Sequence, residues 1–313
     1  MFAYIVRRVL ATIPVMLFVA LFVFSLLYIA PGDPAAIIAG DQATPADVDR
    51  IRASLGLDRP FLIRFFGWLW DVLNGDLGKS IFTNLPVTHM IKQRVEPTLS
   101  LMLFTLCLAL SIAIPAGVIA AWKHGSLIDR LVMMMAVLGF SVPVFVVGYV
   151  LAFVFALQLE ILPVQGYTPF DRGLWPWMRN LVLPAVALGG VYIALIARIT
   201  RATMLEVLSQ DYIRTAKAKG VGQRQMLFVH ALKNAAVPIV TIVGIGFAAL
   251  IGGAVVTESV FAIPGLGRLT VDAILRRDYP VIQGVVLLFS FIYVAVNLLV
   301  DLLYTLFDPR IRY

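Results

Sequence analysis

One segment of the chain invites a phosphate-binding interpretation. Residues 75–80 read Gly-Asp-Leu-Gly-Lys-Ser and end like the loop that cradles nucleotide phosphates. That loop needs a further glycine five residues before Gly78, where Leu73 stands, and it should follow a strand, which this segment does not. The sequence therefore predicts that the chain does not hydrolyse ATP by this common route.

Side chains that could bind metal or attack a substrate are scattered. The three histidines, His89, His124 and His230, are far apart in the sequence, and each is more typical of a surface residue than of a metal ligand. The single cysteine, Cys107, lies inside an apolar run and is best explained by packing. We see no paired nucleophile and base, so we expect no enzyme activity, no metal and no cofactor.

Residues 209–220 carry the most informative polar pattern. The local signals of a short, separate helix are all present: a hydroxyl N-cap, an acid in the first turn, bases in the last turn and a glycine stop. In chain order these residues are Ser209, Asp211, Lys217, Lys219 and Gly220. A second helix is predicted to begin near Gln223, so the first should project as a knob.

This predicted knob mixes apolar and basic residues: Tyr212, Ile213 and Ala216 stand among Arg214, Thr215, Lys217 and Lys219. Such a helix suits docking into a groove of a partner protein. A basic helix beside a membrane could equally lie against anionic lipid. Residue chemistry alone leaves both interpretations open.

The elements that must position this knob are long apolar runs. The chain has 313 residues, of which 61% are hydrophobic and 14% charged, far below the roughly 25% charged residues of soluble domains. Runs of about 20 apolar residues can cross the ~30 Å hydrocarbon core of a bilayer. Six are present: 9–30, 97–122, 131–159, 180–197, 234–257 and 279–300. The sequence predicts an all-α integral membrane protein with six transmembrane helices.

The first run follows two arginines, as a secretory signal would, but its 22 residues exceed the roughly 7–15 of a signal's apolar core. We expect it to remain uncleaved. An even number of spans places both termini on one side. Short segments on that side hold 13 Lys or Arg residues, against 5 on the other, so the positive-inside rule predicts cytoplasmic termini. Residues 31–96 are then extracytoplasmic, and 198–233 are cytoplasmic.

The outer segment is predicted to contain two helices. Thr44 and Pro45 mark a helix start, and Gly56 marks its end. Residues 61–73 are too short to span and carry a narrow polar stripe of Arg64, Gly67 and Asp71. This second helix could lie on the outer membrane surface or pack against the spans.

Prolines and glycines recur inside the apolar runs, where small residues let helices approach closely. They include Pro115, Gly117, Gly139, Pro143, Gly244, Gly246, Gly252 and Gly253. Ordinary helix packing explains most of them.

Residues 214–220, Arg-Thr-Ala-Lys-Ala-Lys-Gly, resemble the degenerate Glu-Ala-Ala-x-x-x-Gly loop of binding-protein-dependent ABC importer permeases. Ala216 matches the second alanine and Gly220 the glycine, whereas Arg214 and Thr215 replace the glutamate and the first alanine. The downstream Ile-x-Leu-Pro part is absent. In that family the loop is a coupling helix seated in a cleft of the ATPase, and the departures fit the peptide and nickel branch better than the sugar branch.

Other segments resemble the first permease subunit of that branch, and the likeness covers nearly the whole chain. They are residues 30–34, 75–80, 97–100, 258–267, 277–280 and 308–312. The resemblance implies a type I ABC importer permease core over residues 97–313, preceded at 1–96 by the first span and the long extracytoplasmic segment.

The resemblance also implies partners. These are a second homologous permease, two cytoplasmic ATP-binding subunits and an extracytoplasmic substrate-binding protein, all at a lipid bilayer, with no nucleic acid. The expected cargo is a dipeptide or oligopeptide, with a nickel chelate, glutathione or another small solute of the same branch as the alternative.

Two other classes of membrane protein fit the sequence less well. An ion-coupled secondary transporter would usually place an ionisable residue near the membrane midplane, but Arg198, Glu258 and Asp301 all fall towards the ends of runs. A channel or passive scaffold would not need the short capped helix at 209–220. Both classes are therefore less favoured than an importer.

Overall fold

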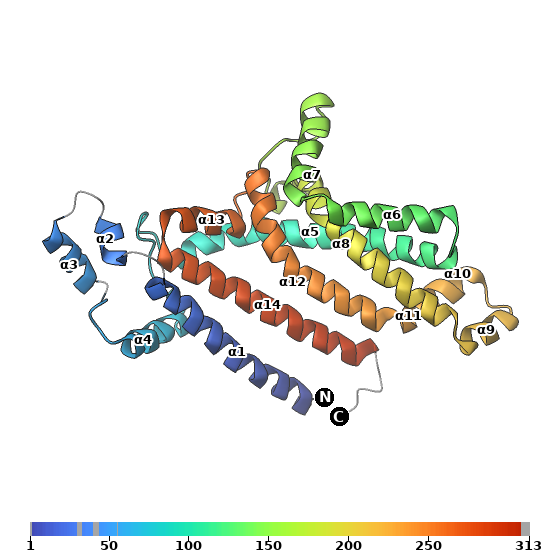
Figure 1. The fold of residues 1–313 in the computed structure, drawn as a ribbon, viewed down its shortest axis with the longest axis horizontal. Coiled ribbons are helices and arrows are strands. Elements are labelled where there is room, and N and C mark those ends of the chain that lie inside the picture. The colour runs from blue at the N-terminus through green and yellow to red at the C-terminus, as the bar shows by residue number, and fades with distance from the viewer. Residues whose placement is uncertain (1, 30–32, 40–43, 55, 308–313) are drawn as a thin grey trace. The chain divides into compact units, whose positions relative to one another are not determined.

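The computed structural model describes residues 2–29, 33–39, 44–54 and 56–307. Its named elements are helices (Figure 1). The first half of the chain forms α1 (Phe2–Ile29), α2 (Pro34–Ala39), α3 (Pro45–Ser54), α4 (Phe61–Leu73), α5 (Val87–Trp122), α6 (Leu127–Ser141), α7 (Val144–Leu151) and the π-helical η1 (Ala152–Gln158). The second half forms η2 (Phe170–Arg172), α8 (Leu174–Leu208), α9 (Asp211–Ala218), α10 (Gln223–Gln225), the π-helical η3 (Met226–Ala231), α11 (Leu232–Asn234), α12 (Ala236–Val260), α13 (Leu266–Arg276) and α14 (Tyr279–Phe307).

Among the residues that the structure describes, five helices are long and apolar enough to cross a membrane: α1, α5, α8, α12 and α14. The predicted run 180–197 lies inside α8, whose 35 residues would extend about 52 Å at ~1.5 Å per residue. This helix therefore exceeds the ~30 Å hydrocarbon core and carries the chain well beyond the apolar run. The family-like segments 30–34 and 308–312 lie partly or wholly outside the described residues.

The predicted third run, 131–159, is not one straight helix. α6 and the α7–η1 pair bend by 103° relative to each other (Figure 1). The break falls at Val142 and Pro143, both of which have extended backbone angles. Proline disfavours helical geometry in the residue before it and lacks the N–H that would continue the helix. The pair counts as a sixth span only if both arms together cross the membrane.

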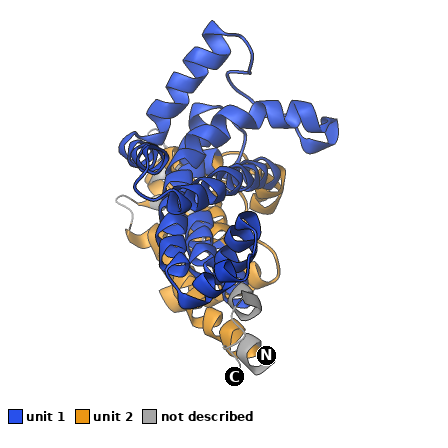
Figure 2. Cartoon of the chain, turned by 90° about the vertical axis from the view of Figure 1, so that its right-hand side faces the viewer, with its two compact units in different colours: residues 1–5, 95–268, 293–313 blue, residues 6–94, 269–292 orange. Residues whose placement is uncertain are grey.

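The chain divides into two compact units, coloured separately in Figure 2. The first unit comprises residues 1–5, 95–268 and 293–313. In it α8 packs against α6, α7 and α12, and the buried cluster includes Leu101, Leu188 and Leu250. The second unit comprises residues 6–94 and 269–292.

Glycines allow helices of the first unit to approach each other closely, as the sequence predicted. A Cβ at Gly117 of α5 would lie 2.7 Å from the carbonyl oxygen of Ala197 and 2.7 Å from Thr200 Cβ, both on α8. A Cβ at Gly139 would lie 2.9 Å from the Gly190 oxygen. Because lipid offers no hydrophobic gain for helix association, such van der Waals contact is what holds membrane helices together.

We therefore expect Gly117→Ala to destabilise the chain by about 1–3 kcal/mol, the usual cost of overpacking. Equilibrium unfolding of the purified protein in mixed micelles would measure this. Gly67→Ala is the matched control, because its Cβ would meet nothing within 4 Å. That control should be neutral or slightly stabilising, since alanine favours a helix interior. Equal effects of the two substitutions would contradict the close-approach argument.

A buried ion pair fixes the start of α6 on α8. Asp129 has a side chain only 5% exposed and pairs with the Arg201 guanidinium through two contacts, the Nη2–Oδ2 contact being 2.7 Å. The Gly125 N–H donates to the same carboxylate at 2.9 Å, and Ser126 accepts from the Asp129 N–H as the N-cap. The first turn of α6 is thus held by charge as well as by packing.

Glu258, near the end of α12, is fully buried. Its Oε1 accepts a hydrogen bond from Thr98 Oγ1 at 2.6 Å, and its Oε2 accepts one from the Arg268 N–H at 3.0 Å. Thr98 Oγ1 in turn accepts from the Leu266 N–H at 2.8 Å. The carboxylate therefore satisfies the N-terminus of α13, a helix that the apolar runs did not predict, and ties it to α5.

In the second unit α4 has the bounds predicted for it. Phe65 of α4 is buried against Phe24 of α1 and Leu287 of α14, so this helix packs on apolar helices. Its opposite face leaves Phe66 and Trp70 exposed. The first predicted outer helix is present as α3, which follows Thr44; Gly56, just beyond it, is left-handed with φ of 62°.

Candidate functional site

The short helix predicted at 209–220 is present as α9, Asp211–Ala218. Its start differs from the prediction. Ser209 is not its N-cap but belongs to the end of α8, where its hydroxyl donates to the Glu206 carbonyl at 2.7 Å. Gln210 occupies the N-cap position and makes no side-chain capping bond. The serine was misassigned because α8 runs on to Leu208, so the hydroxyl finds a carbonyl of the preceding turn instead.

The end of α9 is the predicted glycine stop. Gly220 has φ of 79°, in the left-handed region that glycine adopts without a steric penalty. Its N–H donates to the Lys217 carbonyl at 3.0 Å, and the Val221 N–H donates to the Ala216 carbonyl at 3.2 Å. These two bonds form a Schellman motif, which satisfies the last carbonyls of the helix and reverses the chain. α10 then begins at Gln223, as predicted.

The residues predicted to form the apolar face of α9 differ in how far they are buried. Ile213 is only 4% exposed and packs with Met204 and Val207 of α8 and Leu227 of η3. It is therefore unavailable to a partner, contrary to the expectation that it fills a partner's groove. Ala216 is half-buried. Ile213 instead anchors α9 to its own chain, because the segment after Gly220 folds back beneath it.

The exposed part of α9 is amphipathic and basic. Tyr212 is 44% exposed, and partial burial raises the pKa of its phenol above the ordinary value, so the ring stays neutral near pH 7. Asp211 lies 3.4 Å from Arg214 in an exposed pair, which contributes little to stability. Thr215, Lys217 and Lys219 are also exposed. Tyr212 with these polar residues forms the outward surface of the knob.

Two further exposed residues were missed by the sequence analysis. Phe228 and Val229 of η3 are 46% and 54% exposed, and η3 contacts α9. Leu227 and Ala231, at a spacing of four, face the buried cluster instead. The same spacing in the sequence of residues 226–231 could have indicated that Phe228 and Val229 lie on the exposed side. A π-helical turn often marks a functional position in a helix.

No cluster of three possible metal ligands is found among the residues that the structure describes. His124 lies 3.3 Å from Asp129 beside the α6–α8 ion pair, and His89 bonds Gln93 at 2.8 Å.

Comparison with known proteins gives two family matches that together cover the chain. Residues 113–313 match the model described as the binding-protein-dependent transport system inner membrane component. Residues 1–113 match the amino-terminal model of such membrane components.

Full-length relatives agree with these matches. The chain is 56% identical over 310 residues to a probable peptide ABC transporter permease of Sinorhizobium fredii, with 99% of each chain covered. It is 47% identical to a putative peptide transport system permease of Brucella abortus, over all of both chains. It is 38% identical to the dipeptide transport system permease DppB of Escherichia coli, covering 100% of this chain and 99% of that one.

Among solved structures, the MetNI methionine ABC transporter in an inward-facing conformation is similar in fold. The match has a TM-score of 0.58 at 18% identity and covers 70% of this chain and 96% of that chain. This likeness confirms the predicted all-α permease fold. The chain is a multi-pass membrane protein and a transport subunit, not an enzyme, and it belongs to the family of binding-protein-dependent transport system inner membrane components.

Proposed function

We propose that this chain is one permease subunit of an ATP-driven importer that takes up dipeptides or oligopeptides. The full-length similarity to peptide and dipeptide permeases, reaching 56% identity, carries the proposal. The subunit would work with a second homologous permease, two ATP-binding subunits and an extracytoplasmic substrate-binding protein. In this proposal the chain consists of an amino-terminal part at 1–96 and a permease core at 97–313.

Uptake by membrane vesicles that hold the complete transporter tests the cargo. A panel of dipeptides and oligopeptides, with a nickel chelate and glutathione as comparison solutes, should show ATP-dependent accumulation of peptides. Accumulation of a comparison solute without any peptide would contradict the proposed substrate class.

The proposed topology places both termini and α9 in the cytoplasm. We expect a single cysteine at Ser209, in a Cys107→Ala background, to stay unlabelled when an impermeant thiol reagent is added outside intact cells. It should react once the membrane is opened, because Ser209 is exposed. Labelling of intact cells would overturn this orientation.

The proposed role of α9 is to dock the ATP-binding subunit. It projects between two turns, its inner face is anchored by Ile213, and its outer face combines Tyr212 with basic side chains. An aromatic side chain such as Tyr212, surrounded by charged residues, suits docking into a groove on another protein. Nucleotide-driven closure of the ATP-binding subunits would then move α9 and, through α8, the membrane helices.

Replacing Tyr212 separates docking on protein from contact with lipid. Tyr212→Asp should reduce co-purification of the ATP-binding subunit about tenfold or more, because an unpaired charge at a closed interface is costly. Neutralising Arg214, Lys217 and Lys219 together should weaken co-purification less. If α9 instead lies on anionic lipid, the triple variant should have the larger effect. Ala218→Ser, on the exposed end of α9, serves as the control and should behave as wild type.

A further inference from the structure

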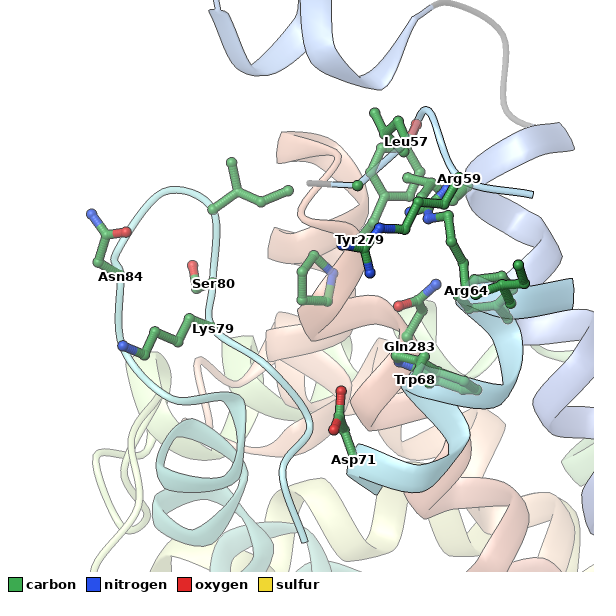
Figure 3. A pocket seen from close by; sticks show the side chains of 17 residues that line it. Leu57, Arg59, Arg64, Trp68, Asp71, Lys79, Ser80, Asn84, Tyr279 and Gln283 are labelled. Carbon is green, nitrogen blue, oxygen red and sulfur yellow. The ribbon is translucent and has the colours of Figure 1, made fainter. Parts of the chain in front are cut away.

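The second unit contains a cavity of about 650 Å³ that the proposed coupling function does not use. It is lined by residues of α1, α4, the loops at 56–59 and 79–84, and the start of α14. Figure 3 shows Arg59, Arg64 and Trp68 on one side, Lys79, Ser80 and Asn84 on the opposite side, and Asp71 towards the lower end. The polar stripe of α4 noted in the sequence, Arg64, Gly67 and Asp71, faces this cavity.

The lining of the cavity is partly apolar and partly charged. Phe24, Leu27 and Pro280 line it together with the buried side chains of Tyr279 and Gln283. Ligand sites in proteins typically combine such an apolar lining with a few convergent polar groups, in volumes of about 300–1,000 Å³. The size suits a molecule as large as a short peptide.

The charged groups are divided between the two signs. Within the described residues, Arg59, Asp71 and Lys79 form no ion pair with one another or with other side chains. Arg64 is held by a hydrogen bond to the Tyr28 hydroxyl, and its guanidinium lies over the rings of Phe24 and Tyr28, 5.7 and 5.3 Å from their centroids. Two cations and one carboxylate that form no ion pair with any described residue therefore line one cavity.

The wall carrying Lys79 is rigidly built. Ser80 is buried, and its hydroxyl donates to Asp278 at 2.5 Å, while the Ile81 N–H donates to the other carboxylate oxygen at 3.2 Å. The Ser80 N–H also donates to the Leu85 carbonyl at 3.0 Å. The serine that seemed to end a phosphate loop thus fastens this loop to the start of α14. A fixed wall loses little freedom when a ligand binds, which favours affinity.

We propose that this cavity binds a small zwitterion, with its carboxylate beside Arg59 and its ammonium group beside Asp71. The choice of a short, unblocked peptide as that zwitterion rests on the proposed function of the chain. The headgroup of phosphatidylethanolamine carries the same pair of charges and is the competing source of this chemistry. A pocket of this kind would give the peptide a first binding position on the permease itself.

Binding of alanyl-phenylalanine to the full chain in phosphatidylcholine nanodiscs, measured by calorimetry, tests the proposal. N-acetylation and C-amidation of this dipeptide should each weaken binding about tenfold, since each removes one charge-assisted contact. Equal affinity of the free and the doubly blocked dipeptide would overturn the proposal.

Each single substitution should remove selectivity for one charged end of the peptide, either the free amino group or the free carboxylate. Asp71→Asn should no longer distinguish the free from the acetylated peptide, whereas Arg59→Gln should no longer distinguish it from the amidated one. Asp58→Asn and Lys92→Gln are the matched controls, because both residues are exposed and neither lines the cavity. A pattern in which the controls and the cavity variants lose selectivity alike would contradict the assignment.

Filling the cavity provides a test that does not depend on charge. Gly67 lies in the interior of α4, and a Cβ there would meet nothing within 4 Å, so Gly67→Leu should fold and abolish peptide binding. Gly252→Leu, equally open at its Cβ, should leave binding intact. Retained binding in Gly67→Leu would place the ligand elsewhere and overturn the proposal.

Nanodiscs containing phosphatidylethanolamine distinguish the two sources. If this lipid displaces the dipeptide and is retained by the wild type but not by Gly67→Leu, the headgroup is the ligand and the peptide assignment fails. Peptide import that persists without any such binding also overturns the cavity assignment but leaves the proposed function intact. Selective peptide binding in a transporter that imports no peptide would uphold the cavity and contradict the function.

Discussion

Replacing Gly220 by valine is expected to reduce peptide uptake by about tenfold while leaving the membrane helices folded. At φ of 79° a non-glycine residue is strained by roughly 1–2 kcal/mol, and a β-branched one is at the unfavourable end. A tenfold change corresponds to about 1.4 kcal/mol. The Schellman bonds from Gly220 and Val221 would be lost, so α9 would no longer be held in position over η3.

The neighbourhood of Gly220 provides sharp controls. A Cβ at Gly220 would meet nothing within 4 Å, so any loss comes from the backbone and not from crowding. Gly220→Asn should retain most uptake, because asparagine tolerates the left-handed region. Gly222→Val should also be active, since Gly222 has φ of −60° and equally open space.

Uptake should be measured together with stimulation of ATP hydrolysis by the loaded binding protein. Both should fall in Gly220→Val, whereas melting of the purified subunit should change little. Full uptake in this variant would end the interpretation of α9 as the coupling element.

Glu258→Ala is expected to destabilise the subunit by about 3–5 kcal/mol, because the buried Thr98 Oγ1 and the partly buried Arg268 N–H both lose their acceptor. Glu258→Gln should cost less, since one amide oxygen can still accept one of those bonds. Equilibrium unfolding in mixed micelles measures both. Glu206→Ala, at an exposed site, should stay within about 0.5 kcal/mol of wild type.

A double-mutant cycle tests whether the carboxylate is the cause. A Cβ at Gly265 would lie 2.3 Å from Glu258 Oε1, so Gly265→Ala should destabilise the wild type. In the Glu258→Ala background that clash is removed, and the second substitution should cost much less. Additive effects would show that Glu258 does not organise this turn.

Elements whose signals are local could be predicted from the sequence. Apolar runs long enough to span predicted helices within α1, α5, α8, α12 and α14, because the bilayer imposes both length and composition on any spanning segment. The stop at Gly220 was predictable because a left-handed residue after a basic last turn is set by backbone sterics within a few residues. The bounds of α4 followed in the same way from its amphipathic period.

Contacts between distant segments determine which of those local signals the folded chain uses. Ser209 has the chemistry of an N-cap, yet α8 continues past its apolar run. The Ser209 hydroxyl therefore donates to the Glu206 carbonyl in the last turn of α8. Ile213 looked like a docking residue, but contact with Leu227 buries it. A local pattern cannot show which surface a neighbouring segment will cover. Residues 131–159 were predicted as one apolar run that includes Pro143, but α6 and α7, which both pack on α8, meet at a bend of 103°.

Charged residues far apart in the chain were the least predictable. Asp129 and Arg201, separated by 72 positions, form a pair through two contacts, and Thr98 meets Glu258 across 160 positions. Likewise Asp71 and Lys79 line one cavity together with Gln283 only because α4 and the loop at 79–84 both pack beside the start of α14. Such encounters depend on how helices cross, and small residues such as Gly117 set that crossing through contacts with residues distant in the sequence.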